Sequence, residues 1–347
     1  MNKARLKRIL LTFIKYTGGF HLSRYLTRNR LRILCYHGIS LAKENKFRPG
    51  VYMHPETFHR RMEILRDGSY TVLALDDALK HLYADTMPNC STVITIDDGW
   101  TGTASIAAPI LNKLSFPSTL YVTSYYLKNR TQVFNMALAY MLMITSEQHL
   151  KTEDLAEGLH GTFDLGNAKE RESCFTQILT YGETLDGAEC RQQLLDSIAN
   201  RLGVSEALNV PGLFRIMSHE DIASVLASGM DIQLHTHRHN FPFDDKRAAE
   251  REIIDNREEL MKTVPGTLTH FCYPSGEYTP DHAKWLKEWG VESATTCDVG
   301  LNTTETNPYF LKRILDNDIL GDIEFEAELS GFIELKRMAT QAFGRSR

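Results

Sequence analysis

The chain has 347 residues, of which 42% are hydrophobic and 24% charged, and its formal net charge is -5. This ordinary globular composition leaves room for one large α/β domain or two smaller ones, and the lack of a basic excess argues against a dedicated nucleic-acid binder. The six cysteines include no Cys-x-x-Cys pair, so we expect neither a disulfide framework nor a cysteine zinc site.

The one basic region is the segment 1–30, which carries Lys and Arg but no Asp or Glu. Its apolar run 9–14 is shorter than the roughly 7–15 residues of a signal-peptide core and the ~20 residues of a membrane span. Apolar residues recur at helical spacing: Leu6, Ile9, Leu10, Phe13 and Ile14. This pattern predicts a basic amphipathic helix, which can make a peripheral contact with an anionic membrane. The alternative, which we favour, is a helix packed on the domain with its basic residues outward.

The rest of the chain alternates between strand and helix patterns. Strands are expected at 32–36, 70–75, 93–96, 118–123, 231–234, 268–273, 293–296 and 310–314. Helices are expected at 55–66, from 76, and at 104–114, 218–227, 246–263 and 280–289. Such alternation is typical of a parallel sheet, and about eight strands favour a (β/α) barrel or a relative of one, with its site at the carboxyl ends of the strands.

Four divisions of the chain follow from these patterns. The N-terminal helix occupies 1–30, and the barrel is formed by 31–126 together with 216–330. Residues 127–215 read as helices without any alternating strand, so we expect a helical insertion in a barrel loop that shapes specificity. Residues 331–347 form a basic C-terminal tail.

Two polar clusters follow predicted strands. Asp97 and Asp98 end one strand, where neighbouring side chains point to opposite faces and can take different roles. His235 and His239 follow another strand, and one helical turn or a tight loop brings their rings to one point. Two imidazoles and one carboxylate suit zinc and some other divalent ions, and three protein ligands leave a position open for water.

These clusters resemble the motifs of a known family. The stretch 95–99 (Thr-Ile-Asp-Asp-Gly) resembles the first motif of the polysaccharide deacetylase family, carbohydrate esterase family four. The stretch 235–239 (His-Thr-His-Arg-His) is similar to the second motif, and 271–276 (Phe-Cys-Tyr-Pro-Ser-Gly) to the third. The early segment 34–38 and the stretch 294–313 also match, so the resemblance covers about 32–125 and 217–315.

The resemblance implies a deformed (β/α) barrel of about seven or eight strands and a metal-dependent hydrolase that removes acetyl groups from N-acetylated sugars. Asp98, His235 and His239 would hold the metal, most readily zinc, and Asp97 would be the general base. The third motif would supply the substrate and oxyanion contacts, through the backbone N–H of Ser275 and the neighbouring Tyr273.

Two departures from the family pattern leave roles open. Cys272 stands where many members have an arginine that orients the base, so Arg313 and His37 are candidates for that task. The segment 313–319 lacks the histidine that serves other members as general acid. The acid would then be His37, His237 or a water molecule.

The resulting function hypothesis is N-deacetylation of an acetamido sugar in a poly- or oligosaccharide, as in exopolysaccharide biosynthesis. The alternatives are hydrolysis of another linear amide and a non-catalytic carbohydrate-binding or assembly role. We expect a cytoplasmic protein, in contact at most with the inner face of the membrane, and no nucleic-acid partner.

Overall fold

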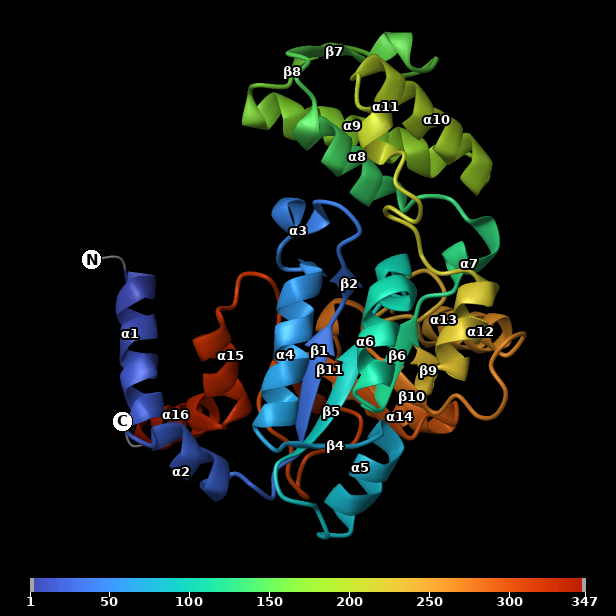
Figure 1. Cartoon of the computed structure of the whole chain (residues 1–347). Helices are drawn as coiled ribbons and strands as arrows, with labels where there is room; N and C mark the ends of the chain where they lie inside the picture. Colours follow the sequence, from blue (N-terminus) through green and yellow to red (C-terminus); the bar gives the residue numbers. More distant parts are fainter. Residues whose placement is uncertain (1–2, 345–347) are drawn as a thin grey trace.

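A parallel barrel forms the centre of the chain in a computed structural model that describes residues 3–344 (Figure 1). Its seven strands, in their order around the barrel, are β1 (Arg32–Tyr36), β12 (Leu311–Leu315), β11 (Ser293–Val299), β10 (His270–Cys272), β9 (Met230–Leu234), β6 (Ser118–Val122) and β5 (Ser91–Ile96). An eighth strand, β4 (Thr71–Val72), pairs with β5 outside the ring. The predicted barrel of about seven or eight strands is therefore confirmed.

The barrel closes through β1, which pairs both with β5, the next barrel strand along the chain, and with β12, the last. Leu34 lies opposite Ile314 of β12 on one side and opposite Ile94 of β5 on the other. Every residue of β1 and β5 is buried, which is the burial expected of strands covered on both faces. The ends of these strands are consequently fixed by a fully packed core.

Helices surround the barrel, and their local sequence explains where they begin. They are α4 (Pro55–Asp67), α5 (Leu75–Tyr83), η1 (Thr103–Ala107), α6 (Ala108–Lys113), α12 (His219–Ala227), α13 (Lys246–Leu260) and α14 (His282–Glu288). Pro55 occupies the first turn of α4, and the helix buries Phe58 and Met62. Ser218 and Asp221 form a capping box at the start of α12.

A small sheet of β2 (Gly38–Ile39) and β3 (Tyr52–Met53), with α3 (Glu44–Phe47) between them, follows β1. Most of the insertion lies beyond it, at the top of Figure 1, whereas its first helix, α7 (Tyr125–Asn129), lies lower, near α12 and α13. The other helices of the insertion are α8 (Phe134–Ile144), α9 (Ala168–Thr184), α10 (Ala188–Arg201) and α11 (Ser205–Leu208). The expectation that this segment has no strand is wrong, because β7 (His149–Lys151) and β8 (Thr162–Asp164) form an antiparallel pair. A short 3-10 turn, η2 (Thr152–Asp154), follows β7.

Both ends of the chain meet in one helical lobe, on the left of Figure 1. It contains α1 (Lys3–Tyr16), α2 (Gly19–Leu26), α15 (Asp322–Leu329) and α16 (Phe332–Gly344). The segment 1–30 thus holds two helices rather than one, and most of the expected tail is helix α16. Within the described range, none of the helices has the length and apolar character needed to cross a membrane.

Candidate active site

Two adjacent carboxylates leave the end of β5 in different directions. The N–H of Asp97 still donates to the carbonyl of Tyr36 on β1, at 2.9 Å, so Asp97 continues the sheet pairing. Asp98 and Gly99 then adopt positive φ values of 73° and 90°. This left-handed backbone is uncommon for a non-glycine residue, and here it turns the chain sharply between the two acids. It separates the environments of the two acids, as the sequence predicts.

Asp98 lies between the two histidines. Its Oδ1 is 3.2 Å from Nε2 of His235 and 3.3 Å from Nε2 of His239. Oδ1 is buried and has no hydrogen-bond partner in the described part of the chain, whereas Oδ2 accepts a hydrogen bond from Nε1 of Trp100 at 2.8 Å. Two nitrogens and one unpartnered carboxylate oxygen around a common point fit a divalent cation. Burial alone would raise the pKa of Asp98, but the two histidines lower it well below its usual range.

Further contacts orient the two imidazoles. Nδ1 of His235 lies 2.8 Å from the carbonyl of Cys272 on β10. A proton on Nδ1 therefore satisfies this contact and leaves Nε2 as the nitrogen with a free lone pair toward Asp98. The backbone N–H of His235 donates to Asn256 of α13 at 3.0 Å. His239 has a positive φ of 57° and is 43% exposed, so it faces solvent while His235 is buried.

Asp97 is held by a buried arginine from a distant strand. Nη1 of Arg313, on β12, donates to Oδ1 of Asp97 at 2.8 Å, and its Nε donates to the carbonyl of Thr296 at 2.7 Å. The other oxygen, Oδ2, accepts from Sγ of Cys272 at 3.4 Å and lies 3.7 Å from Nε2 of His37. Burial would raise the pKa of Asp97, but the positive charge of Arg313, followed by that of the nearby histidines, lowers it to about 2.

This contact supplies the missing orienting group. Both candidates for the partner of Asp97, Arg313 and His37, reach its carboxylate, and Arg313 is the closer of the two. The thiol of Cys272 reaches the same carboxylate from the position where an arginine was expected. The arginine that pairs with Asp97 thus comes from β12 instead of β10. Asp97 needs such a partner because an unpaired buried charge would cost several kcal/mol.

His237, by contrast, points away from both carboxylates. Its Nδ1 lies 2.8 Å from Oγ of Ser124, and its carbonyl accepts from the N–H of Tyr125 and from Oγ1 of Thr123. Burial lowers the pKa of His237. The structure therefore gives His237 a role in fixing the loop, and of the two histidines considered as the acid it brings only His37 to Asp97.

The third motif places its two residues differently. Ser275 lies in the 3-10 turn η3 (Pro274–Gly276) with a positive φ of 57°, and Gly276 follows with φ 70° against Cys297. Tyr273 is 1% exposed and its ring packs among Phe241, Phe271 and Phe310. The expectation that Tyr273 contacts substrate does not agree with this burial, because its ring belongs to the core.

A cavity of about 480 Å³ opens beside His239. Asp98, Trp100 and His239 line it from the barrel. The opposite wall comes from the insertion, through α8, α9 and α10: Phe134, Asn135, Met136, Leu179, Gly182, Glu183 and Arg191. Sequence reasoning did not single out Trp100 or Arg191. Trp100 stands two residues after Asp98, but nothing in the sequence marks Arg191.

Comparison with known proteins agrees with this architecture. The polysaccharide deacetylase family model matches residues 186–294, which include the histidine cluster and the third motif. No curated protein matches the chain. The predicted resemblance to polysaccharide deacetylases is confirmed by the family match, which also supports the predicted enzyme class, a hydrolase of carbon–nitrogen bonds other than peptide bonds.

Several solved structures share the fold at low sequence identity. The deacetylase PplD of Streptococcus pyogenes, in complex with acetate, is 15% identical, with a TM-score of 0.58 over 87% of this chain and 99% of that chain. IcaB from Ammonifex degensii is 16% identical, with a TM-score of 0.56 over 87% and 97%. A de-N-acetylase from Aggregatibacter actinomycetemcomitans is 13% identical, with a TM-score of 0.52 over 86% and 99%.

Proposed function

We propose that the protein is a metal-dependent hydrolase that removes N-acetyl groups from an acetamido sugar of a poly- or oligosaccharide. One observation carries this proposal. Two imidazole nitrogens converge on an Asp98 oxygen that has no hydrogen-bond partner among the described residues, and the neighbouring carboxylate of Asp97 is paired with Arg313. Water and the acetamide are consumed, the carbonyl carbon–nitrogen bond breaks, and acetate and a free amine are released.

Asp98, His235 and His239 would hold the metal. Their nitrogen and oxygen donors suit zinc best among the ions that accept such a set. A divalent ion held there would polarise the amide carbonyl and lower the pKa of the attacking water. The remaining steps fall to side chains of the chain itself.

Asp97 acts as the general base in this proposal. Its pKa of about 2 means that the carboxylate is ionised at neutral pH. Arg313 occupies Oδ1 and fixes the plane of the carboxylate, whereas the hydrogen bonds that described residues make to Oδ2 come only from the thiols of Cys272 and Cys35, which are weak donors. Oδ2 is therefore the oxygen that takes the proton from water. The proton then passes from Oδ2 to Nε2 of the nearby, partly exposed His37, 3.7 Å away, and His37 delivers it to the leaving amine.

The oxyanion contact is assigned to the backbone N–H of Ser275. The position of η3 supports this assignment, because the turn follows β10, whose last residue Cys272 contacts both Asp97 and His235. The sugar would bind in the cavity between Asp98 and the insertion, which supports a role for 127–215 in substrate choice. Hydrolysis of another linear amide remains the second candidate, since the same centre would serve it.

Acetate release from N-acetylglucosamine oligomers tests the proposal. We expect chelation to abolish release and added zinc to restore it. Asp97→Asn should lower release by about 10²–10⁴-fold, the usual contribution of a general base, while bound metal is retained. Asp98→Asn should lose the metal itself. Asp77→Asn is the matched control, because Asp77 belongs to a second Asp-Asp pair at the exposed N-terminus of α5.

Two results would contradict parts of this scheme. Release that persists both in chelator and in the Asp97→Asn variant would refute the mechanism. Stoichiometric metal without release from any acetylated glycan would favour the carbohydrate-binding alternative.

A further inference from the structure

The outer side of helix α1 is apolar and exposed. Five side chains on it are between 51% and 84% exposed: Leu6, Ile9, Leu10, Phe13 and Tyr16. At 3.6 residues per turn these positions form one continuous stripe along the helix. An amphipathic helix of a globular protein normally turns such a stripe toward the core, so its orientation here needs an explanation.

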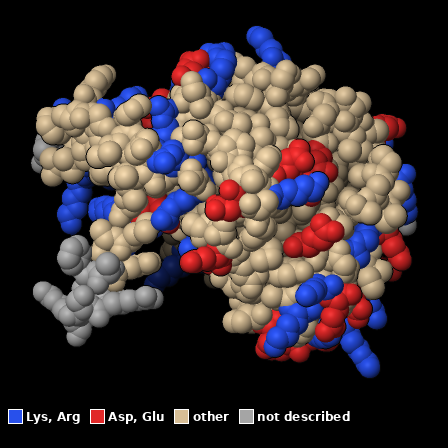
Figure 2. Space-filling view, turned by 90° about the horizontal axis from the view of Figure 1, so that it is seen from below, with Lys and Arg blue, Asp and Glu red and all other residues tan. Residues whose placement is uncertain are grey.

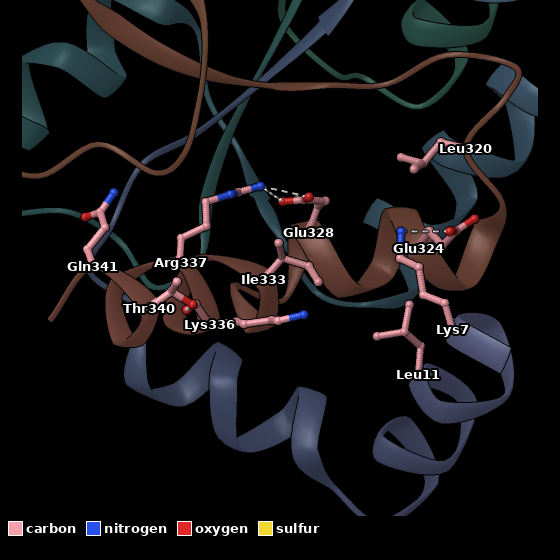
Figure 3. A pocket seen from close by; sticks show the side chains of 10 residues that line it. All are labelled: Lys7, Leu11, Leu320, Glu324, Glu328, Ile333, Lys336, Arg337, Thr340 and Gln341. Carbon is pink, nitrogen blue, oxygen red and sulfur yellow. Dashed lines mark hydrogen bonds and ion pairs between the residues drawn. The ribbon is translucent and has the colours of Figure 1, made fainter. Parts of the chain in front are cut away.

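The opposite side of α1 is fixed to the domain by charge and packing. Lys7 and Arg8 pair with Glu324 of α15 at 2.9 and 3.1 Å, and Lys15 pairs with Glu326 at 2.6 Å. Leu11 is 4% exposed and belongs to a small core of the terminal lobe. Figure 3 shows Lys7 and Leu11 reaching from α1 into the space beside α15, with the Lys7–Glu324 pair drawn. The favoured expectation of outward basic residues is therefore wrong for these three, and the apolar stripe is what faces out.

Helix α2 extends the exposed apolar surface of the lobe. Leu22, Tyr25 and Leu26 are each close to 60% exposed, although Phe20 of the same helix is buried. Thus eight of the fifteen exposed large apolar side chains in the described part of the chain lie on α1 and α2. A concentration of this kind marks an interaction surface rather than ordinary scattered exposure.

The charges around this surface identify its partner. Lys3 and Arg5 are exposed and flank the stripe, one on each side in helical projection, and Arg28 lies over the ring of Tyr25 at 4.2 Å. Residues 1–43 contain no acidic side chain. Figure 2 shows this lobe on its left as a mainly tan surface bordered by blue side chains. A second copy of the chain would bring like charges together, whereas an anionic lipid surface complements them.

We propose that α1 and α2 bind the surface of an anionic membrane, with the apolar stripe in the boundary between headgroups and acyl chains and Lys3 and Arg5 at the lipid phosphates. The lobe then lies in the plane of the interface rather than across the bilayer. This inference goes beyond the proposed catalytic function and does not depend on it. It rests on the orientation of α1, which the pairs to Glu324 and Glu326 determine.

Vesicle co-sedimentation of the full chain tests the inference. We expect binding to vesicles of phosphatidylcholine with phosphatidylglycerol, and much weaker binding to phosphatidylcholine alone or at high salt. Leu10→Asp with Phe13→Asp should weaken binding by at least tenfold, and Arg5→Gln by about fivefold. The matched control is Ile254→Asp with Met261→Asp, since both residues are exposed apolar side chains in or next to α13. This control should bind like the unchanged protein.

Three outcomes would overturn the inference. The first is the absence of binding to anionic vesicles at low salt by protein whose circular dichroism shows it folded. The second is equal weakening by the α13 control. The third is a dimer in light scattering that becomes monomeric in the Leu10→Asp, Phe13→Asp variant without vesicle binding by either, which would assign the stripe to a second copy of the chain.

Discussion

Asp97 and Asp98 share a peptide bond but have different electrostatic surroundings. The carboxylate of Asp97 meets the guanidinium of Arg313, while that of Asp98 meets two imidazoles. An ion pair with arginine fixes one oxygen and keeps the acid ionised, which suits a base that must be ready at neutral pH. Two imidazole nitrogens and a carboxylate oxygen instead form a ligand set that suits a divalent cation. The left-handed backbone at Asp98 is what allows neighbours in sequence to face such different partners.

Removal of the arginine charge gives the sharpest prediction at this scale. In Arg313→Met, burial raises the pKa of Asp97 without the opposing positive charge, so the proposed base becomes protonated at a higher pH. We expect the acid limb of the kcat/KM profile to move to higher pH, and activity near pH 6 to fall on the order of tenfold or more. Arg313→Lys keeps a positive charge and should shift the limb less. The pH–rate profile of acetate release measures both.

An acid limb that stays in place in both variants would show that Arg313 does not control the ionisation of Asp97. The lysine variant also guards against misfolding, because loss of one partner of a buried ion pair typically costs about 3–5 kcal/mol. Metal content should remain unchanged in either variant, since Arg313 makes no contact with the histidines among its described hydrogen bonds.

At the level of elements, the sequence predicts best what depends on local pattern. The strand that ends at Asp97 and the histidines after β9 could be placed because parallel strands bring their carboxyl ends together. The choice of Arg313 over His37 could not be made, because it depends on β12 lying beside β1 and β11 in the closed barrel. The outward stripe of α1 could not be predicted either. Periodicity shows that the helix has an apolar side, but not whether that side packs on the domain or faces solvent. The pair β7 and β8 was missed because each strand has only three residues.

The insertion provides a prediction about the cavity. Asn135 lies on the exposed side of α8 and lines the cavity opposite His239. Asn135→Trp should fill part of the 480 Å³ space, raise KM for oligosaccharides several-fold and leave metal content unchanged. Gln193→Trp is the matched control, because Gln193 is an exposed residue of α10 that does not line this cavity. Steady-state kinetics on oligomers of different length measure the effect, and equal KM values in all three proteins would exclude Asn135 from the binding site.

Across the whole molecule, closure of the barrel by β1 brings the two ends of the chain together. Arg32, the first residue of β1, is fully buried, and it donates to the carbonyl of Leu329 at the end of α15 at 2.6 Å. It also donates to the carbonyl and hydroxyl of Thr27 after α2, and to the carbonyl of Arg30. One side chain thus joins the barrel to both parts of the terminal lobe that carries the apolar stripe.

Arg32→Met should therefore loosen the lobe as a unit. The substitution keeps an unbranched side chain but leaves buried carbonyls without a donor, and hydrogen bonds from a charged group are worth about 1.5–3 kcal/mol each. We expect the free energy of unfolding to fall by about 3 kcal/mol and amides of α1 and α2 to exchange faster, with metal content preserved. Arg66→Met is the control, because Arg66 pairs only at the surface of α4, where such pairs contribute little. Denaturant unfolding and hydrogen exchange measure these changes. Equal effects of the two substitutions would show that Arg32 does not hold the lobe to the barrel.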